Sequence, residues 1–310
     1  MATAFHLEES AMSMRLLEGL LLVVASIPWT ARAAEPWEQA ILDRAADTAV
    51  ADARDLRSAH GKGTFVVRRK VRDEEEGVWS EGTFELFWNH GRCRVDLHLT
   101  RHLVRILKPG KEGEERVDLK GERRVILGNE KSGTLVTFSP RIHPTGCQVE
   151  HYGSLDEAIN FAEFPCRHPA QLWQDVLNVD RLIANLDGDP IRLFDGKDGR
   201  IEGRYRVKNS KTTQGAFEID PHSGYRVTSH AVFVDPPVEQ RGEQRLVWRQ
   251  AESVWFAKEL HLTERFGGEV EIRTSVIYTT FSANQKIDDA VFDLQSLEIP
   301  AKTRKLDRAK

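Results

Sequence analysis

Apolar and polar residues alternate most regularly over residues 82–99, on both sides of an Asn-His-Gly turn. The apolar positions would point to one side of two strands, and they are Phe84, Leu86, Trp88, Cys93, Val95, Leu97 and Leu99. A period of two residues is typical of strands with one face in water and one face buried. The pattern therefore predicts a β-hairpin, whose apolar face covers either an ordinary core or something that the protein carries.

Similar alternation predicts further strands before and after a helical region. The segments are 63–71, 102–108, 123–129, 133–139, 200–209, 214–221, 223–235, 243–250, 253–266 and 268–281. Short stretches of Gly, Asn, Lys and Glu separate them, as in a meander of antiparallel strands joined by tight turns. The fold class that follows is α+β, mainly antiparallel β.

A helix is expected before the first strand. Residues 36–59 are rich in alanine, and Pro36 suits the first turn of a helix. The apolar stripe of this helix would consist of Trp37, Ile41, Ala45 and Ala49.

A helical insertion is expected between the two groups of strands. Ser154 followed by Glu157 forms a capping box that opens a helix over 155–164, and a second helix would run from near Pro169 to residue 186. No change in composition and no Pro-rich linker divides the chain. Residues 34–310 are therefore expected to form a single half-barrel domain, with a helical insertion at about 150–187.

The first 33 residues have the features of a secretory signal peptide. Arg15 precedes an apolar run from Leu16 to Ile27, and Ala31-Arg32-Ala33 has the small-x-small pattern of a cleavage site. The run is shorter than the about 20 apolar residues that a membrane-spanning helix needs. We expect cleavage after Ala33 and a periplasmic or secreted protein that does not span a membrane.

Composition narrows the choice of partners. The chain has 310 residues, of which 40% are hydrophobic and 30% charged, and its formal net charge is -4. The hydrophobic share provides enough apolar residues for a large core. The small negative net charge gives no reason to expect a polyphosphate partner. Tryptophans and arginines interleave along the strands, as in some RNA-binding sheets, but export and the acidic balance argue against nucleic acid.

An oxidising compartment would allow one disulfide among the three cysteines. Cys147 and Cys166 flank a short helical stretch and are the preferred pair. Closing that loop would contribute about 3 kcal/mol in the chain-entropy model. Cys93 is expected to pack as a small apolar residue on its strand.

A series of short motifs follows the insertion. An Asp-x-x-x-Gly-Tyr turn begins at Asp220, a long strand contains Val254 to Phe256, an Asn-x-x-Ile-Asp turn begins at Asn284, and a Phe-x-Leu segment begins at Phe292, ahead of Pro300. In this order, and with a leading helix that runs into GTFVVRR, the chain resembles the LolA-like periplasmic lipoprotein carriers, the outer-membrane lipoprotein-sorting family.

This resemblance implies an antiparallel sheet curved into an incomplete barrel, with helices across its concave face and an apolar cavity between them. Strand alternation gives a set of residues whose faces line either this cavity or a plain core. They are Phe84, Leu86, Trp88, Val95, Leu97, Tyr205, Val207, Phe217, Phe256, Leu260, Val270 and Ile272. In the family the cavity receives lipoprotein acyl chains with the help of a cationic residue. Arg69 is the candidate for that role, because it shares a face with Phe65 and Val67, and the alternative, which the sequence favours, is an ordinary surface arginine.

The chain differs from a minimal carrier by extra residues between about 108 and 190. The expected partner is therefore a lipid or the acyl chains of a lipidated protein, bound in the apolar cavity without catalysis and without a cofactor. A second hypothesis is a cell-envelope sensor or protein-interaction module on the same fold, in which the long strands dock with an envelope protein.

No catalytic or metal site emerges from the sequence. Asp96, His98 and His102 are of the residue types that bind zinc, but a turn at Thr100 and Arg101 would direct His102 to the opposite face from His98. Neither a Gly-x-Ser-x-Gly elbow nor a His-Glu-x-x-His motif occurs. We expect no metal, and a hydrolase with dispersed catalytic groups is the least favoured hypothesis.

Overall fold

The structure is a computed structural model that describes residues 35–72, 75–89, 91–107, 114–129, 131–139, 146–161, 191–206, 213–234, 239–266 and 270–309. These ranges contain two α-helices, α2 (Pro36–Asp55) and α3 (Leu155–Phe161). The strands are β1 (Ser58–Val71), β2 (Gly77–Asn89), β3 (Arg92–Leu107), β4 (Glu114–Asp118), β5 (Arg123–Asn129), β6 (Ser132–Phe138), β7 (Cys147–Tyr152), β8 (Arg192–Asp195), β9 (Ile201–Arg206), β10 (Thr213–Asp220), β11 (Arg226–Val234), β12 (Glu239–Ala251), β13 (Val254–Phe266), β14 (Val270–Ala283) and β15 (Arg304–Asp307). Short 3-10 turns are η1 (Lys197–Gly199), η2 (Pro221–Ser223), η3 (Asp289–Phe292) and η4 (Leu294–Ser296).

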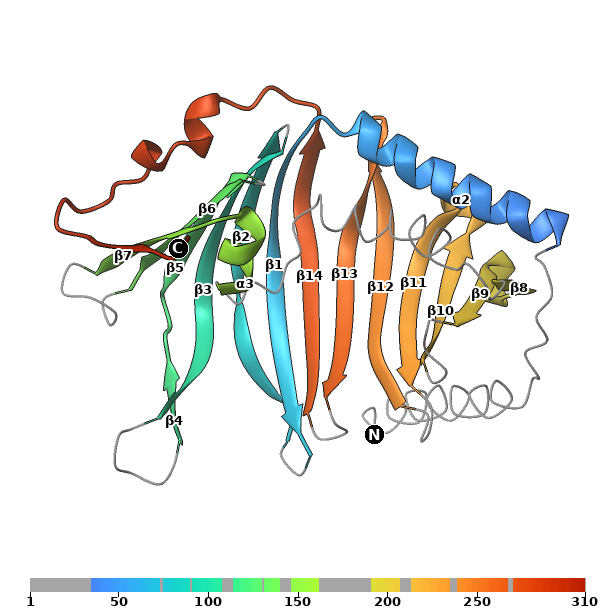
Figure 1. The fold of residues 1–310 in the computed structure, drawn as a ribbon, viewed down its shortest axis with the longest axis horizontal. Coiled ribbons are helices and arrows are strands. Elements are labelled where there is room, and N and C mark those ends of the chain that lie inside the picture. The colour runs from blue at the N-terminus through green and yellow to red at the C-terminus, as the bar shows by residue number, and fades with distance from the viewer. Residues whose placement is uncertain are drawn as a thin grey trace, which may run out of the picture.

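All these strands belong to one sheet, in the order β15-β7-β6-β5-β3-β2-β1-β14-β13-β12-β11-β10-β9-β8, with β4 beside β3. The first strand, β1, pairs with β14 in the middle of the sheet, and two antiparallel meanders leave this centre in opposite directions (Figure 1). At one edge, β15 pairs with β7 in parallel.

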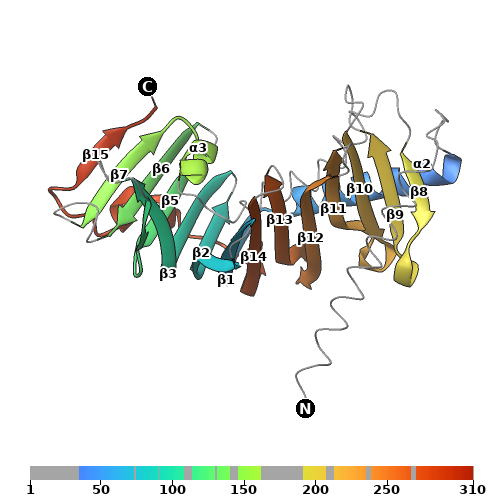
Figure 2. The ribbon, with the colours of Figure 1, turned by 90° about the horizontal axis from the view of Figure 1, so that it is seen from below.

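The sheet is curved and does not close on itself (Figure 2). Both described helices lie on its concave side: α3 lies over β5 and β6, and α2 crosses the strands near β8 to β11. The expected incomplete barrel of mainly antiparallel strands, with helices on the concave face, is therefore confirmed. The tail that contains η3 and η4 lies on the opposite, convex side, where Leu294, Leu297 and Ile299 pack against β5, β6 and β7.

Helix α2 begins at a capping box, in which the Glu38 carboxylate accepts from the Glu35 N–H at 2.7 Å. It ends at Asp55, four residues before the predicted end, because Leu56 is extended and the chain enters β1 at Ser58. The predicted stripe is wrong at its start, where Trp37 is 47% exposed. The buried positions of the helix are Glu38, Leu42, Ala45, Ala49 and Asp52. Glu38 faces inward because its carboxylate also accepts from the Leu193 N–H of β8, at 3.0 Å.

The predicted hairpin of residues 82–99 is confirmed as β2 and β3, with Gly91 in the turn at a φ of 79°. Segment 102–108 is not a separate strand, because β3 runs on to Leu107 through a β-bulge at Thr100. Gly82 makes the bulge possible: a Cβ there would lie 2.1 Å from the His98 carbonyl oxygen. Strands β4, β7, β8 and β15 are further elements that the alternation does not predict.

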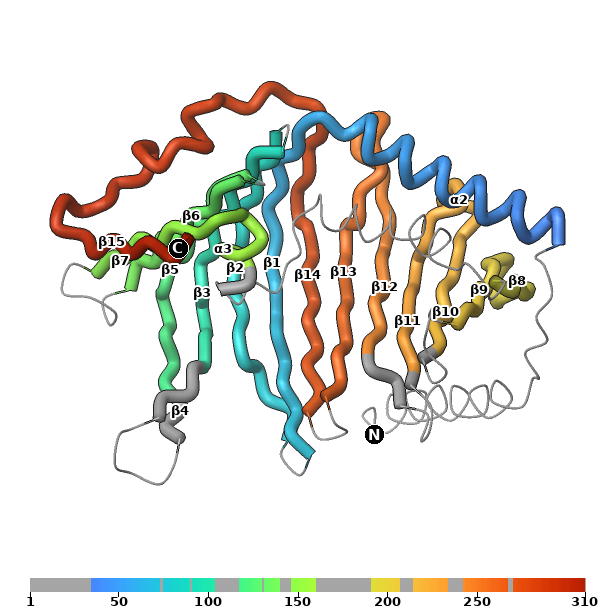
Figure 3. Tube along the Cα trace, viewed as in Figure 1, coloured from blue at the N-terminus to red at the C-terminus, as the bar shows by residue number. Residues whose placement is uncertain are grey.

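Asn284 joins the end of β14 to the segment between α2 and β1 at the rim of the sheet. Its side-chain oxygen accepts from the Arg57 N–H at 2.7 Å, and its amide nitrogen donates to the Asp55 carbonyl at 2.8 Å. Figure 3 shows the end of α2, the start of β1 and the end of β14 meeting at this point. The Asn-x-x-Ile-Asp motif thus fixes where the helix stops and the sheet begins.

Several predictions concern residues outside the described ranges: the signal peptide over 1–33, the helix over 169–186, and Cys166 and Val207. The structure describes α3 at the start of the helical insertion, and the insertion and the single domain over 34–310 stay predictions. Among the described helices, none combines the length and apolarity needed to cross a membrane.

Candidate ligand-binding face

Strand register places the candidate residues of the first meander on the concave face. Residues paired across neighbouring strands point to the same side of a sheet. Gly63 pairs with both Phe84 and Tyr278, and Phe84 pairs with Leu97. By alternation from these residues, the same side also carries Arg69, Leu86, Trp88, Val95, Leu260 and Ile272. This is the side on which α3 packs.

The second meander continues the same face. Phe217 pairs with His230, His230 with Gln244, and Gln244 with Leu262, which lies on the same side of β13 as Leu260. Tyr205 and Phe217 pack under α2, against Leu42 and Ala45. Burial raises the pKa of Tyr205 to about 12, and its hydroxyl is 2.7 Å from Nε2 of His230. This phenol is therefore a neutral, anchored part of the face.

Most of the candidate residues form the floor of this face rather than its open surface. Each of the following is at most 3% exposed: Phe84, Leu86, Val95, Leu97, Tyr205, Phe217 and Leu260. Arg69, Trp88, Phe256 and Ile272 are only partly buried. A bound molecule would touch the second set and rest on the first.

Four glycines let aromatic rings lean over the floor of the face. A Cβ on Gly203 would lie 2.0 Å from Cζ of Phe217, and a Cβ on Gly215 would lie 2.0 Å from Cζ of Tyr205. Gly61 and Gly63 of β1 similarly lie under the rings of Tyr278 and Phe84. The rings occupy space that a side chain would take, and they therefore rise less far above the sheet.

A group of aromatic residues on β13 and β14 remains partly exposed. Phe256 and Phe281 stack with their ring centroids 4.0 Å apart, and Tyr278 meets Phe281 edge-on at 5.7 Å. Trp88 packs against the main core cluster, as Phe256 and Phe281 do, and its indole Nε1 has no hydrogen-bond partner among the described residues. This group offers flat apolar surface and one unused N–H donor.

Arg69 supplies a cation at the other end of β1. Its guanidinium carbon lies 4.9 Å from the centre of the Trp79 ring, and its register partners are Ile272 and Gly77. The Nε atom is buried and has no hydrogen-bond partner in the part of the chain that the structure describes. Val270 ends the same face, opposite Val71. The cationic candidate thus lies between an aromatic ring and aliphatic side chains.

A buried polar network interrupts the face beside β3. Nδ1 of His102 is 3.3 Å from the Ser80 hydroxyl, Nε2 is 3.2 Å from Arg124, and Arg124 donates to Glu122 at 2.5 Å. Arginine can only donate, so Nε2 accepts and the proton resides on Nδ1, which donates to Ser80. His102 therefore cannot take a proton from Ser80, and the two are not a nucleophile with its base.

The burial of His102 also removes it from the metal candidates. Burial and the neighbouring Arg124 lower the pKa of His102 to about 4. His98 is exposed on the convex face, whereas His102 lies on the concave face. The two residues therefore lie on opposite faces, as predicted, but a bulge at Thr100 separates them and not the expected turn. Within the described ranges, no three His, Cys, Asp or Glu side chains gather into a possible metal site.

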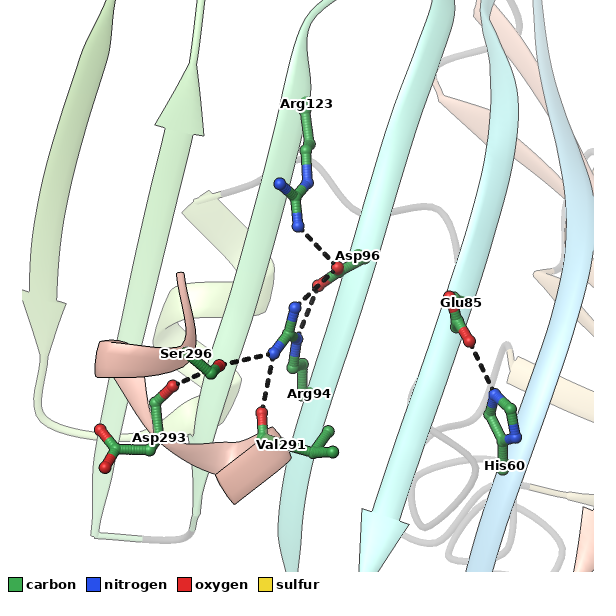
Figure 4. Close-up of polar contacts among 8 residues, drawn as sticks. All are labelled: His60, Glu85, Arg94, Asp96, Arg123, Val291, Asp293 and Ser296. Atoms are coloured by element: carbon green, nitrogen blue, oxygen red, sulfur yellow. Dashed lines mark hydrogen bonds and ion pairs between the residues drawn. The ribbon is translucent and has the colours of Figure 1, made fainter. Parts of the chain in front are cut away.

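Asp96 is engaged in an ion-pair network on the convex face. It lies between two arginines, with 2.9 Å contacts to both Arg94 and Arg123 (Figure 4). Burial alone would raise the pKa of its carboxyl, but the hydrogen bonds from these arginines outweigh burial and lower it. Arg94 also donates to the Val291 carbonyl and the Ser296 hydroxyl, both at 2.9 Å. The network therefore holds the tail against the sheet.

The two described cysteines lie on opposite faces. Cys93 is fully buried in the concave core, as predicted, and burial raises the pKa of its thiol. Cys147 is buried on the convex side, near Val149 and Leu297, and its thiol hydrogen-bonds with Thr303. Its predicted partner Cys166 lies outside the described residues, so the disulfide stays a prediction.

Sequence reasoning missed Trp79, Tyr278, Phe281 and Arg124 as parts of the concave face. Trp79 lies at a β-bulge, where β2 shifts its register with β1 between Val67 and Arg68. Tyr278 and Phe281 are three residues apart, across the shift at Lys62 and Gly63. A period of two cannot assign such residues to one face. The proximity of Arg69 to Trp79 likewise depends on a bulge that alternation does not reveal.

Comparisons with known proteins give structural neighbours only. No family model matches the sequence, and no curated protein matches it. A DUF1329 family protein from Desulfovibrio piger is 9% identical, with a TM-score of 0.47, and the match covers 83% of this chain and 99% of that one. A LolA superfamily protein from Nitrosomonas europaea is 10% identical, with a TM-score of 0.38, and the match covers 84% of this chain and 98% of that one.

A third neighbour, from Vibrio parahaemolyticus, is described as an outer membrane lipoprotein-sorting protein domain. It is 10% identical, with a TM-score of 0.43, and the match covers 82% of this chain and 97% of that one. Members of the superfamily that the sequence motifs resemble are thus among the structures to which this chain is similar. A likeness at this level of identity carries no information on function.

Proposed function

We propose that this protein is an exported, non-catalytic carrier or chaperone that binds a lipid or the acyl chains of a lipidated protein on its concave face. The observation that carries the proposal is that both meanders contribute large apolar side chains to this one face. Phe256, Phe281 and Ile272 remain partly exposed there. Moving a methylene from water onto such a surface is worth about 0.8 kcal/mol, so a long acyl chain supplies enough free energy for binding.

Arg69 favours an amphiphile over a plain hydrocarbon. The buried Nε of Arg69 has no acceptor among the residues that the structure describes, and an unsatisfied buried donor is costly. A carboxylate, phosphate or ester oxygen of a ligand would satisfy that donor while its chain lay over Val67 and Ile272. The order of motifs that resembles the lipoprotein carriers supports the same class of ligand.

Native mass spectrometry of protein exported to a bacterial periplasm tests the proposal. We expect a copurifying lipid or lipidated protein, with the mature chain beginning at Ala34. A stoichiometric protein without lipid would favour the sensor or interaction module instead. A bare chain that also fails to bind an added fluorescent fatty acid would overturn the carrier proposal.

A matched pair of variants on β14 locates the binding face. Ile272 and Ile277 are both partly buried, but Ile272 is on the concave face, whereas Ile277 pairs with Thr64 on the convex face. Ile272→Gln should weaken fatty-acid binding about tenfold, equivalent to about two methylenes of contact, while Ile277→Gln leaves it unchanged. Equal effects of the two substitutions would place the ligand elsewhere.

A further inference from the structure

The segment 301–310 is strongly basic in a chain whose net charge is negative. It contains five basic residues and one acidic residue, whereas the formal charge of the whole chain is -4. Its strand, β15, pairs with β7 and is the last strand in the order of the sheet. Figure 2 shows β15 at one end of the curved row of strands. The basic residues therefore lie along an edge, at the end of the concave face.

Most of this positive charge has no local counterion. Arg308 contacts Glu150 at 3.2 Å. The exposed side chains of Lys302, Arg304 and Lys305 have no ion-pair partner in the described ranges. Because successive residues of a strand point to opposite sides, Arg304 and Lys305 present charge on both faces of the edge. A flat anionic surface could contact both from the end of the sheet.

We propose that Lys302, Arg304 and Lys305 form a basic edge that docks the protein onto an anionic lipid surface. This inference rests on the proposed function, because a lipid carrier must meet a membrane to load or unload. Docking through β15 would bring the open end of the concave face against the headgroups. Lysines on an edge strand also discourage pairing with other strands, but that role alone predicts no binding to membranes.

Vesicle sedimentation with the exported protein, which is expected to begin at Ala34, tests the basic edge. The protein should bind vesicles of phosphatidylcholine mixed with phosphatidylglycerol, and not vesicles of phosphatidylcholine alone. High salt should abolish binding, since the Debye length falls from about 30 Å at 0.01 M to about 3 Å at 1 M. The variant K302Q/R304Q/K305Q should lose about 100-fold in partition coefficient, or about 3 kcal/mol at about 1 kcal/mol per charge.

The control variant is K120Q/K197Q/K286Q, which removes the same charge from three exposed positions outside β15. It should retain vesicle binding, and an equal loss in both variants would mean that only net charge matters. Salt-independent binding, or binding to both kinds of vesicle alike, would overturn the proposal. The fatty-acid affinity of the unmodified protein is measured in parallel. Vesicle binding without fatty-acid binding would count against the carrier function alone. Fatty-acid binding without vesicle binding would count against the basic edge alone.

Discussion

At the scale of single residues, glycine and aromatic residues work as pairs on the concave face. Phe217 and Tyr205 each lie across the glycine of a neighbouring strand, at Gly203 and Gly215. The absent Cβ is what lets each ring lie over the backbone instead of standing upright. The shape of the face therefore depends on residues that themselves make no side-chain contact.

Replacing Gly203 with alanine should destabilise the protein by about 1–3 kcal/mol, because the Cβ and the Phe217 ring would occupy the same space. Urea denaturation followed by circular dichroism measures the loss. Gly77→Ala is the control, since a Cβ there meets nothing within 4 Å. The stability of that variant should be unchanged or slightly higher. Equal stabilities in the two variants would contradict the packing of the ring.

His102 should make stability depend on pH. Its pKa is about 4 in the folded protein, against about 6.5 when unfolded. Between these values the unfolded chain binds a proton that the folded protein does not, so the free energy of unfolding falls as the pH drops from about 6.5 to about 4. The full effect is about 3 kcal/mol, at about 1.4 kcal/mol per pKa unit.

Urea denaturation at a series of pH values measures this slope. Ser80 and Arg124 contact the imidazole ring, Asp118 accepts from the backbone N–H of His102, and Glu122 pairs with Arg124. His102→Gln should remove the slope above pH 5, where carboxylates contribute little. An unchanged slope in this variant would show that another group titrates.

Alternation along single strands was enough to group Phe84, Leu86 and Trp88 with Val95 and Leu97, because the hairpin keeps its register over these residues. It could not show that Tyr205 lies on the same face. That assignment needs the register to be carried across the centre of the sheet, from β1 to β14.

At the scale of elements, α2 is held by a buried ion pair as well as by apolar packing. Arg226 donates to both carboxylate oxygens of Asp52, at 2.6 and 2.7 Å, and its guanidinium lies 4.4 Å from the centre of the Trp255 ring. Burial raises the pKa of Asp52, and the hydrogen bond from Arg226 acts in the opposite direction. The helix contributes mainly small apolar side chains, Ala45 and Ala49 among them, so the pair is an important part of its attachment.

Asp52→Ala should therefore loosen α2 strongly. Removing one partner of a buried pair leaves the other charge uncompensated, at a cost of about 3–5 kcal/mol. Hydrogen exchange should show faster exchange of the α2 amides and little change in β2 and β3. Arg54→Ala, which breaks the exposed pair with Asp55, should change neither. Uniform acceleration across the sheet would mean that α2 does not open on its own.

Local sequence patterns predicted well which segments form helices and strands, but they did not predict the residues at which these elements end. The end of α2 depends on Asn284, which is more than two hundred residues away in sequence and cannot be found from helical periodicity. The continuation of β3 beyond Thr100 depends on Gly82 of the neighbouring strand. The polar residues Thr100 and Arg101 predict a turn when β3 is considered without its neighbouring strand.

At the scale of the whole molecule, the centre of the sheet is a junction between distant parts of the chain. Phe65 of β1 pairs with Val276 of β14. The main core cluster contains residues from both meanders, such as Leu97 and Leu246. Strand rhythm predicts the meanders, but the pairing that joins them leaves no local signal, so strand order was beyond the sequence.

A chain truncated after Phe266 should fail to fold cooperatively. It would retain the thirteen described strands before β14 and lose β15 and also β14, which lies between β1 and β13. Thermal unfolding of this fragment should show no sharp transition. A chain truncated after Pro300 keeps β14, η3 and η4 and should still unfold cooperatively. A sharp transition in the shorter fragment would show that each meander is stable alone.

The late position of β14 in the sequence also bears on when the chain can finish folding. Synthesis delivers β1 early and β14 near the end, and domains fold as their parts become available. The middle of the sheet therefore forms only after nearly the whole chain has been made. A chain exported as we propose would reach a secretion pore before that middle exists.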